Sequence, residues 1–374
     1  MAHDWRPRHA ALLDALEASG ALRPDWRPAF DRVPRHLFIP GQVWTQEATC
    51  VPVTTEAAWW DLVYRDVPIV TQVDDGRSGG PGVATSSNSM PTMVARMLAA
   101  LDVADGQRVL EIGTGSGWNA ALLAARLGSG NVTTVEVDPL LAERAARAVK
   151  EAGYGPHVVY GDGERGWAPG APYDRVVATC SVRRIPYAWV RQTAPGGVIV
   201  APLAWDFWSG LLVRLVVADE GADRVASGGV LGGARFMPMR SERPHEGLAV
   251  DDGTARRATA TGNGTGTVSP DGLAGLAGLG FALYAGLRLP GVVMADGEHD
   301  GRSQVWLHDR AGSAATATAE EVWQYGPRDL WDEVAAVHAD YVRDGSPDAD
   351  AFEVAVTADG HHVRRRSRQP RADG

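Results

Sequence analysis

The chain has 374 residues, of which 45% are hydrophobic and 22% are charged, a composition typical of a soluble globular protein. Its formal net charge of −10 disfavours binding to a phosphate backbone, so we expect no nucleic-acid partner. Two cysteines are too few for a disulfide framework, and we see neither an apolar signal core nor a stretch long enough to span a bilayer, so we expect a cytoplasmic protein that does not enter the membrane.

The first elements are an amphipathic helix over residues 9–18 and a segment over 27–40 that contains Val-Pro-Arg-His around Arg35 and His36. These two polar residues have two interpretations, a solvated helix end or part of a functional motif. Residues 41–65 carry Trp44, Trp59 and Trp60. Such aromatics could cover a substrate mouth, but core packing is their more common use and the one we expect.

A Gly/Asp-rich loop is predicted at residues 74–82, and a Ser-rich loop follows at 85–91 before an apolar helix over 93–101. The Ser-rich loop reads Thr-Ser-Ser-Asn-Ser-Met-Pro. Ser89 could cap this helix, since Ser with a proline soon after it often starts one. It could equally hydrogen-bond a substrate, and one loop can do both.

The central motif is Glu-Ile-Gly-Thr-Gly-Ser-Gly at residues 111–117, between a short buried strand and a helix that runs to Leu127. A strand, a glycine turn and a helix N-terminus form a binding corner typical of nucleotide-like ligands. A dinucleotide fingerprint needs its third glycine at position 118, where this chain has Trp118. The G-x-G-x-G spacing instead resembles motif I of the S-adenosylmethionine (SAM) methyltransferases.

Acidic and polar residues end the strands that follow. Glu136 ends the second strand, where a carboxylate can accept both ribose hydroxyls, and Asp162 follows the third strand, near Tyr160. Asp162 could alternatively form an Asx-type turn. The strand over 172–180 ends near Thr179, and a hairpin is expected over 211–217 and 225–230. This alternation of strands and helices predicts an α/β fold, a doubly wound Rossmann-like sheet with its ligand at the carboxyl ends of the strands.

Three regions are expected. Residues 1–80 form an N-terminal helical lid segment, 81–240 the SAM-binding core, and 241–374 a smaller C-terminal α+β accessory domain. Within the last region we predict a linker at 251–272, strands at 304–307 and 314–318, a helix at 327–341, a closing hairpin at 351–363 and a disordered basic tail. Its histidines do not have metal-ligand spacing, so no metal site is predicted: His299, His308, His338, His361 and His362.

Three motifs resemble the protein-L-isoaspartate O-methyltransferases: Phe-x-x-Val-Pro-Arg-His-x-Phe from Phe30, Ser-x-Pro from Ser89, and Gly-Asp-Gly-x-x-Gly-Trp from Gly161. The resemblance covers about residues 27–240. The family's Gly-x-Gly-Gln-Thr-Ile-Ser-x-Pro stretch is incomplete here, because the Gly-Gln-Thr part is absent. With the added C-terminal domain, this departure resembles the methyltransferases associated with lanthipeptide and graspetide maturation.

The resemblance implies SAM as cofactor, S-adenosyl-L-homocysteine as product, and Ser89 as the residue beside the substrate carboxylate. The implied cofactor-binding residues are Glu111, Gly113, Thr114, Gly115, Gly117, Glu136, Val137, Asp162, Gly163 and Thr179. The implied substrate-binding residues are Ser86, Ser87, Asn88 and Ser89.

We therefore expect a monomeric carboxyl O-methyltransferase that acts on an aspartyl or isoaspartyl side chain in a polypeptide. In one version it methylates a normal aspartate of a ribosomally made peptide to drive succinimide formation. In the other it repairs isoaspartate in damaged proteins. A SAM-binding or peptide-binding module without catalysis is the third interpretation.

Overall fold

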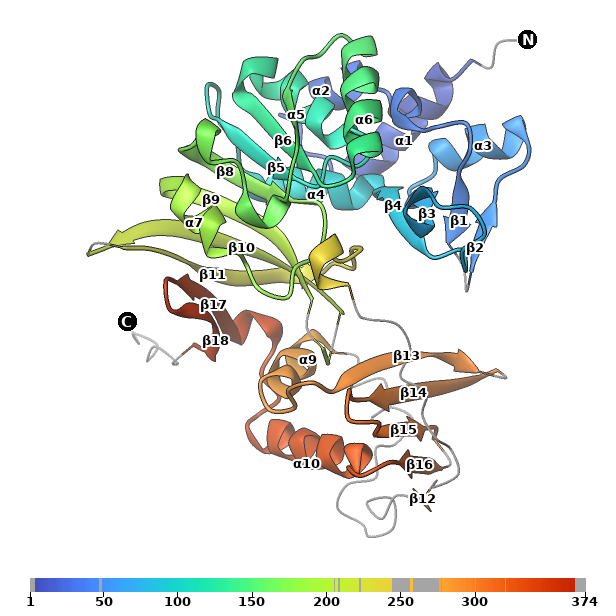
Figure 1. The fold of residues 1–374 in the computed structure, drawn as a ribbon, viewed down its shortest axis with the longest axis vertical. Helices are drawn as coiled ribbons and strands as arrows, with labels where there is room; N and C mark the ends of the chain where they lie inside the picture. Colours follow the sequence, from blue (N-terminus) through green and yellow to red (C-terminus); the bar gives the residue numbers. More distant parts are fainter. Residues whose placement is uncertain are drawn as a thin grey trace.

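The centre of the computed structural model is a nine-stranded sheet with the order β18-β17-β11-β10-β9-β8-β5-β6-β7 (Figure 1). The structure describes residues 4–46, 49–204, 206–207, 209–221, 223–243, 256–257, 276, 278–299, 301–319 and 321–366. Strands β5 to β9 pair in parallel, and β9, β10 and β11 pair antiparallel. The core elements are α4 (Pro91–Leu101), β5 (Val109–Ile112), α5 (Trp118–Leu127), β6 (Val132–Glu136), α6 (Pro139–Glu151), β7 (His157–Tyr160), β8 (Tyr173–Ala178), α7 (Tyr187–Gln192), β9 (Thr193–Ala204), β10 (Ser209–Glu220) and β11 (Asp223–Gly233).

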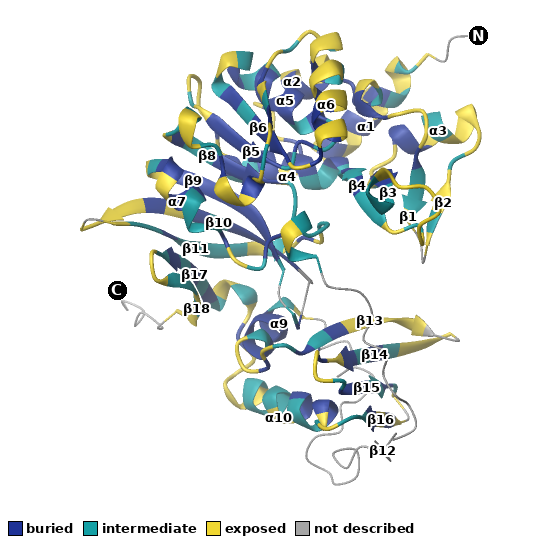
Figure 2. Cartoon of the chain, viewed as in Figure 1, coloured by how far each residue is buried: buried dark blue, intermediate teal, exposed yellow. Residues whose placement is uncertain are grey.

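Both faces of the parallel strands are covered, which explains why β5 is apolar along most of its length. Val109 packs into a core cluster with α1, α2, α4 and α5, whereas its neighbour Leu110 packs into a second cluster that includes α7. Figure 2 shows these strands as the buried centre of the molecule. Sheets covered on both faces require such near-continuous hydrophobic runs. The predicted Rossmann-like α/β class is confirmed.

The N-terminal part packs beside this sheet. It comprises α1 (Arg6–Ala18), α2 (Arg27–Arg32), the 3-10 turn η1 (Arg35–Phe38), α3 (Glu56–Val63) and a small sheet of β1 (Trp44–Gln46), β2 (Cys50–Pro52), β3 (Ile69–Val73) and β4 (Ala84–Asn88). In α3, Trp59 and Trp60 pack against the core cluster, which confirms the packing interpretation for these two residues.

The Ser-rich stretch is not a loop as predicted from the sequence. It forms β4, the edge strand of the order β2-β1-β3-β4, with Asn88 paired to Ile69 and Ser87 to Val70. Serine and asparagine have low strand propensity, but pairing with a buried neighbouring strand overrides it.

The C-terminal part contains a second sheet, with the order β12-β16-β15-β14-β13, packed against two helices. Its elements are β12 (Arg256–Arg257), α9 (Leu279–Gly286), β13 (Val293–His299), β14 (Arg302–His308), β15 (Ala314–Ala317), β16 (Val322–Tyr325) and α10 (Leu330–Arg343). The sequence patterns did not indicate β13 and β16. Most of the predicted linker and the tail from residue 367 lie outside the described residues.

The last hairpin, β17 (Phe352–Thr357) and β18 (Gly360–Arg365), leaves the second sheet and extends the central one. Val356 of β17 pairs with Ala226 of β11, and Phe352 and Val354 are buried in the core of the central sheet. In space this hairpin therefore belongs to the central sheet, although the sequence analysis groups it with the C-terminal domain.

Candidate active site

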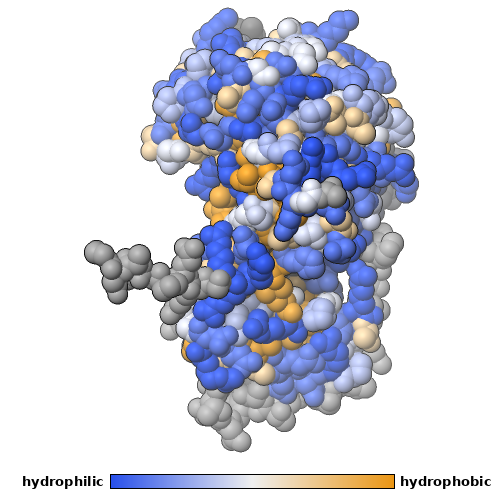
Figure 3. Space-filling view, turned by 90° about the vertical axis from the view of Figure 1, so that its left-hand side faces the viewer, coloured by the Kyte–Doolittle hydropathy of each residue, from blue (hydrophilic) through white to orange (hydrophobic). Residues whose placement is uncertain are grey.

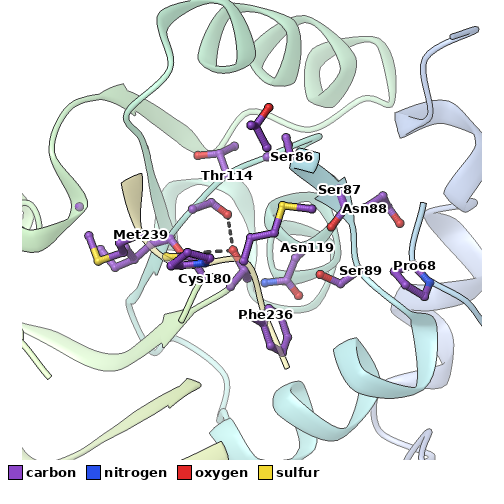
Figure 4. A pocket seen from close by; sticks show the side chains of 18 of the residues that line it. Pro68, Ser86, Ser87, Asn88, Ser89, Thr114, Asn119, Cys180, Phe236 and Met239 are labelled. Carbon is purple, nitrogen blue, oxygen red and sulfur yellow. Dashed lines mark hydrogen bonds between the residues drawn. The ribbon is translucent and has the colours of Figure 1, made fainter. Parts of the chain in front are cut away.

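The carboxyl ends of β5, β6, β7 and β8 open into one cavity of about 1180 Å³ (Figure 4). This is the edge where ligands bind to doubly wound sheets. Every residue that the sequence analysis assigns to the cofactor or the substrate lines this cavity, with the exception of Gly117. The loop tips that carry Gly115, Glu136 and Asp162 therefore meet, and the cavity continues from them to Ser89.

The glycine loop between β5 and α5 has little room for side chains. Gly113 has a φ of +92°, and a Cβ there would lie 2.7 Å from Oγ1 of Thr179. Gly117 has a φ of +88°, and its Cβ would lie 2.9 Å from the Val149 side chain of α6. Gly117 is thus needed for α5 and α6 to pack closely, which explains why it does not reach the cavity.

Glu136 ends β6 with its carboxylate against the glycine loop. Its Oε2 accepts a hydrogen bond from Gly115 N–H at 2.8 Å, and its Oε1 accepts one from Asp138 N–H at 3.0 Å. Burial raises the pKa of Glu136, and the two backbone hydrogen bonds oppose that rise. Each oxygen keeps a further lone pair for a ligand hydroxyl. This geometry fits the predicted ribose-binding role.

Glu111 lies buried beneath the same loop. Its Oε1 accepts from Asn119 Nδ2 at 2.7 Å and its Oε2 from Thr134 Oγ1 at 2.6 Å. The Thr134 hydroxyl is also 2.6 Å from that of Thr114. Burial raises the pKa of Glu111 to about 7, against the effect of the two hydrogen bonds. A cationic ligand in the cavity would favour the ionised form of this carboxyl.

The remaining cofactor candidates line the same cavity as Glu111 and Glu136. The Asp162 carboxylate accepts from Glu164 N–H at 3.0 Å, so the Asx-type turn is present, and Asp162 also lines the cavity. The turn and the ligand role are therefore compatible. Val137, directly after Glu136, is a large apolar side chain with 39% of its surface exposed. Thr179 donates from its hydroxyl to the Gly113 carbonyl, which ties β8 to the glycine loop.

Strand β4 forms the opposite wall, and Figure 4 shows Ser86 to Ser89 across the pocket from Cys180 and Met239. Ser86 is buried, and its hydroxyl accepts from Thr71 at 3.4 Å. The Asn88 side chain accepts from Arg35 Nε at 2.6 Å and donates to Ser116 Oγ at 2.9 Å. Asn88 therefore links this wall to the glycine loop, so its side chain positions the site from within the protein.

Ser89 does not cap helix α4, so that interpretation was wrong. The helix begins at Pro91, and its N-cap residue is Met90, which makes no side-chain capping bond. The Asp66 carboxylate takes this role, accepting from Thr92 N–H at 2.8 Å and from Thr92 Oγ1 at 2.6 Å. Ser89 therefore lines the cavity without capping the helix.

Arg35, which the sequence analysis left undecided, contacts Asn88 and Ser89 but does not itself line the cavity. It is only 1% exposed, so the interpretation as a solvated helix end was wrong. Its guanidinium lies 5.6 Å from the Trp118 ring and donates to five carbonyl oxygens, those of Val63, Arg65, Val67, Asn88 and Ser89. Burial lowers its pKa to about 9, so it stays protonated at neutral pH. The apolar residues Val33 and Phe38, which flank Arg35 in the sequence and are buried, could have indicated that Arg35 is buried too.

An ion-pair cluster that the sequence analysis missed borders the cavity beside Glu136. Arg240 Nη2 lies 3.1 Å from both Asp75 Oδ1 and Asp138 Oδ2, and Arg243 Nη1 lies 2.8 Å from Asp75 Oδ1. The cluster joins the β3–β4 connection to the segment after β11. No sequence pattern relates residues so far apart.

In the parts of the chain that the structure describes, no three His, Cys, Asp or Glu side chains gather in a way that could hold a metal ion. Within the same ranges, no helix has the length and apolarity that crossing a membrane requires.

The strand order, the glycine loop and the acids at the strand ends define a Rossmann-like methyltransferase. A family model described as protein-L-isoaspartate(D-aspartate) O-methyltransferase (PCMT) matches residues 7–243. The chain belongs to this family. The predicted enzyme class, a SAM-dependent O-methyltransferase, is thereby confirmed.

Relatives named protein-L-isoaspartate O-methyltransferase include one from Pyrococcus horikoshii, 38% identical over 62% of this chain and 91% of its own length. Another, from Thermococcus onnurineus, is 36% identical over 62% of this chain and 92% of its own length. A solved structure with the same name resembles the fold with a TM-score of 0.53 at 18% identity, covering 96% of this chain and 100% of that one. The fold of that structure therefore extends over the C-terminal part as well.

Proposed function

We propose that this protein methylates the carboxylate of an aspartyl-type residue in a polypeptide. One observation carries the proposal: an edge strand, β4, lines the cavity that the cofactor candidates line. An unpaired strand edge can hold an extended peptide through its backbone groups. A Cβ built on Gly115 would lie only 3.6 Å from the Ser87 carbonyl oxygen, so a peptide bound at β4 would lie beside the glycine loop rather than between the two.

The residues present fit SAM. The glycine loop leaves space that side chains would fill, Glu136 offers acceptors for hydroxyls, and Glu111 faces the cavity as a buried acid. When bound, SAM supplies an electrophilic methyl group on a sulfonium. Asp162, Gly163 and Val137 would border the rest of the cofactor.

The acceptor needs no strong base, because a carboxylate is ionised at neutral pH. The protein's task is to align a carboxylate oxygen with the methyl carbon, with the Ser89 hydroxyl as donor to the carboxylate. Orientation of this kind can contribute roughly 7–11 kcal/mol. The carboxylate oxygen gains the methyl group, and the sulfur keeps the bonding electron pair. In the ester, the next backbone nitrogen can attack the carbonyl and release methanol, which leaves a succinimide that water opens to aspartate or isoaspartate.

We infer further that the acceptor is a normal aspartate of a ribosomally made peptide. Support comes from the Ser-rich stretch with Ser86 and Ser87, which stands where the family has Gly-Gln-Thr. Isoaspartate repair is the second candidate, and the names of the relatives favour it. The C-terminal part does not distinguish the two, because a chain named for isoaspartate has a similar fold over 96% of this one.

We also propose that the C-terminal part helps to dock the peptide. Leu279 of α9 lines the cavity, so this part reaches the site. Truncation after Arg240 would be a poor test, because it also removes β17 and β18 from the central sheet. Substitutions on α9 test the idea without that damage.

The decisive experiment offers SAM and two synthetic peptides that differ only in Asp or isoAsp at one position. Mass spectrometry reports a gain of about 14 Da on methylation, and a loss of about 18 Da from the starting mass when the succinimide forms. Turnover of the Asp peptide supports peptide modification, and turnover of isoAsp alone supports repair. Tight SAM binding without any turnover would overturn both and leave a binding module.

A further inference from the structure

The cavity is larger than one cofactor requires, and part of its lining is apolar. Its volume of about 1180 Å³ exceeds the roughly 300–1,000 Å³ typical of a site for one small molecule. Five of the seven methionines of the chain line it: Met90, Met93, Met97, Met237 and Met239. We call six of its lining residues, which carry apolar side chains or none, the apolar annex: Met93, Met97, Gly210, Gly233, Phe236 and Leu279.

The annex lies where the core and the C-terminal part meet. Met93 and Met97 come from α4, Gly233 ends β11, and Leu279 begins α9. Figure 3 shows apolar surface gathering at the narrow waist between the upper and lower parts of the molecule. Methionine side chains adapt to irregular apolar partners, and Phe236 adds an aromatic surface.

Gly233 keeps the annex open without any backbone need for glycine. Its φ is not positive, and a Cβ there would meet only Leu279 at 3.7 and 3.9 Å and the Gly210 carbonyl oxygen at 3.9 Å, which are ordinary contacts. Gly210 differs, since its φ is +137° and its Cβ would lie 2.5 Å from the Ala234 carbonyl oxygen. A side chain at position 233 is therefore tolerated by the chain and would occupy annex space.

The annex residues line the same cavity as Ser89. Ser89 is followed by Met90, and Met93 lies in the first turn of the helix that begins at Pro91. An extended peptide advances about 3.3 Å per residue, so the side chains one or two positions from the acceptor stay close to it and enter the same cavity.

We propose, on the basis of the proposed function, that the apolar annex receives a bulky apolar side chain one or two residues from the acceptor. The substrate class is then a peptide with Leu, Met or Phe beside the methylated aspartyl-type residue. The annex selects the substrate sequence, while the strand-end acids bind the cofactor.

The test compares peptides that carry Ala, Leu or Phe at each of the two positions on either side of the acceptor, with Asp or isoAsp according to which is turned over. At one position, kcat/KM should rise about 10-fold or more from Ala to Leu, the discrimination expected of an apolar pocket. Gly233→Val should abolish this preference, mainly through KM, while the Kd for SAM stays unchanged. Gly155→Val is the matched control, because Gly155 is exposed with nothing near its Cβ, and it should keep the wild-type preference.

Met93→Ala is a second variant in case Gly233→Val does not fold. It enlarges the annex and should shift the preference from Leu toward Phe. Methylation without any flanking preference, or a preference that survives in a folded Gly233→Val, would overturn the annex and leave the proposed function standing. No methylation of any peptide by a SAM-binding protein would overturn both.

Discussion

Glu136 offers the sharpest test of the cofactor site, through the substitution Glu136→Ala. The side chain is 7% exposed and fixes two backbone N–H groups, those of Gly115 and Asp138, at 2.8 and 3.0 Å. Its removal takes away the acceptors that we propose for the ribose hydroxyls and leaves the Gly115 and Asp138 N–H groups without this partner.

Stranding buried hydrogen-bonding partners costs about 1–3 kcal/mol. The Kd for SAM should therefore rise roughly 5- to 150-fold at neutral pH, given about 1.4 kcal/mol for each factor of ten. Glu136→Gln keeps the shape and one acceptor oxygen, so it should fall between the wild type and the alanine variant.

Isothermal titration calorimetry with SAM and with S-adenosyl-L-homocysteine measures the change directly. Glu143→Ala, at an exposed position of α6, is the control for loss of one negative charge nearby. Circular dichroism checks that each variant is folded. An unchanged Kd in folded Glu136→Ala would refute the role given to this carboxylate.

Three further predictions concern Ser89, Glu111 and His36. Ser89→Ala should lower kcat/KM about 10- to 150-fold, because it removes a hydrogen bond to a charged group. The SAM affinity and the melting temperature should not change. Turnover equal to that of the wild type would contradict this role of Ser89. The pKa of Glu111 is near 7 in the free protein, and a bound cation needs the ionised form, so SAM affinity should fall about 10-fold from pH 8 to pH 6. Glu111→Gln should make that profile flat, and a wild-type slope in this variant would exclude Glu111 as its source. Burial lowers the pKa of His36 to about 4, below its unfolded value of 6.5. The folded state therefore favours the neutral imidazole. This contribution to stability is complete above pH 6.5 and is lost as the pH falls toward 4. His36→Gln should reduce the drop in melting temperature over that range, and an identical drop would point to other groups.

The cofactor side of the site was predictable from the sequence. Gly113 to Gly117, Glu136 and Asp162 each follow a short apolar strand, and parallel strands present their carboxyl ends at one edge of a sheet. The local pattern sets where each strand stops, and the general rule for such sheets brings the strand ends together. The predicted strands at 304–307 and 314–318 and the helix at 327–341 were found for the same reason, since each has its own periodicity.

The substrate side was decided only by tertiary structure. Ser86 to Asn88 became a strand because β3 lies beside them, and Arg35 was buried by partners up to 54 residues away. Asp66, 26 residues before its partner, replaced Ser89 as the cap of α4. Arg243 meets Asp75 across 168 residues. Each of these contacts depends on where distant segments meet after the apolar faces are buried, and the residues nearby in the chain carry no signal for it. The chain's own pattern thus determined the central sheet and the residues at its strand ends, whereas packing between distant segments determined which side chains line the opposite wall of the cavity.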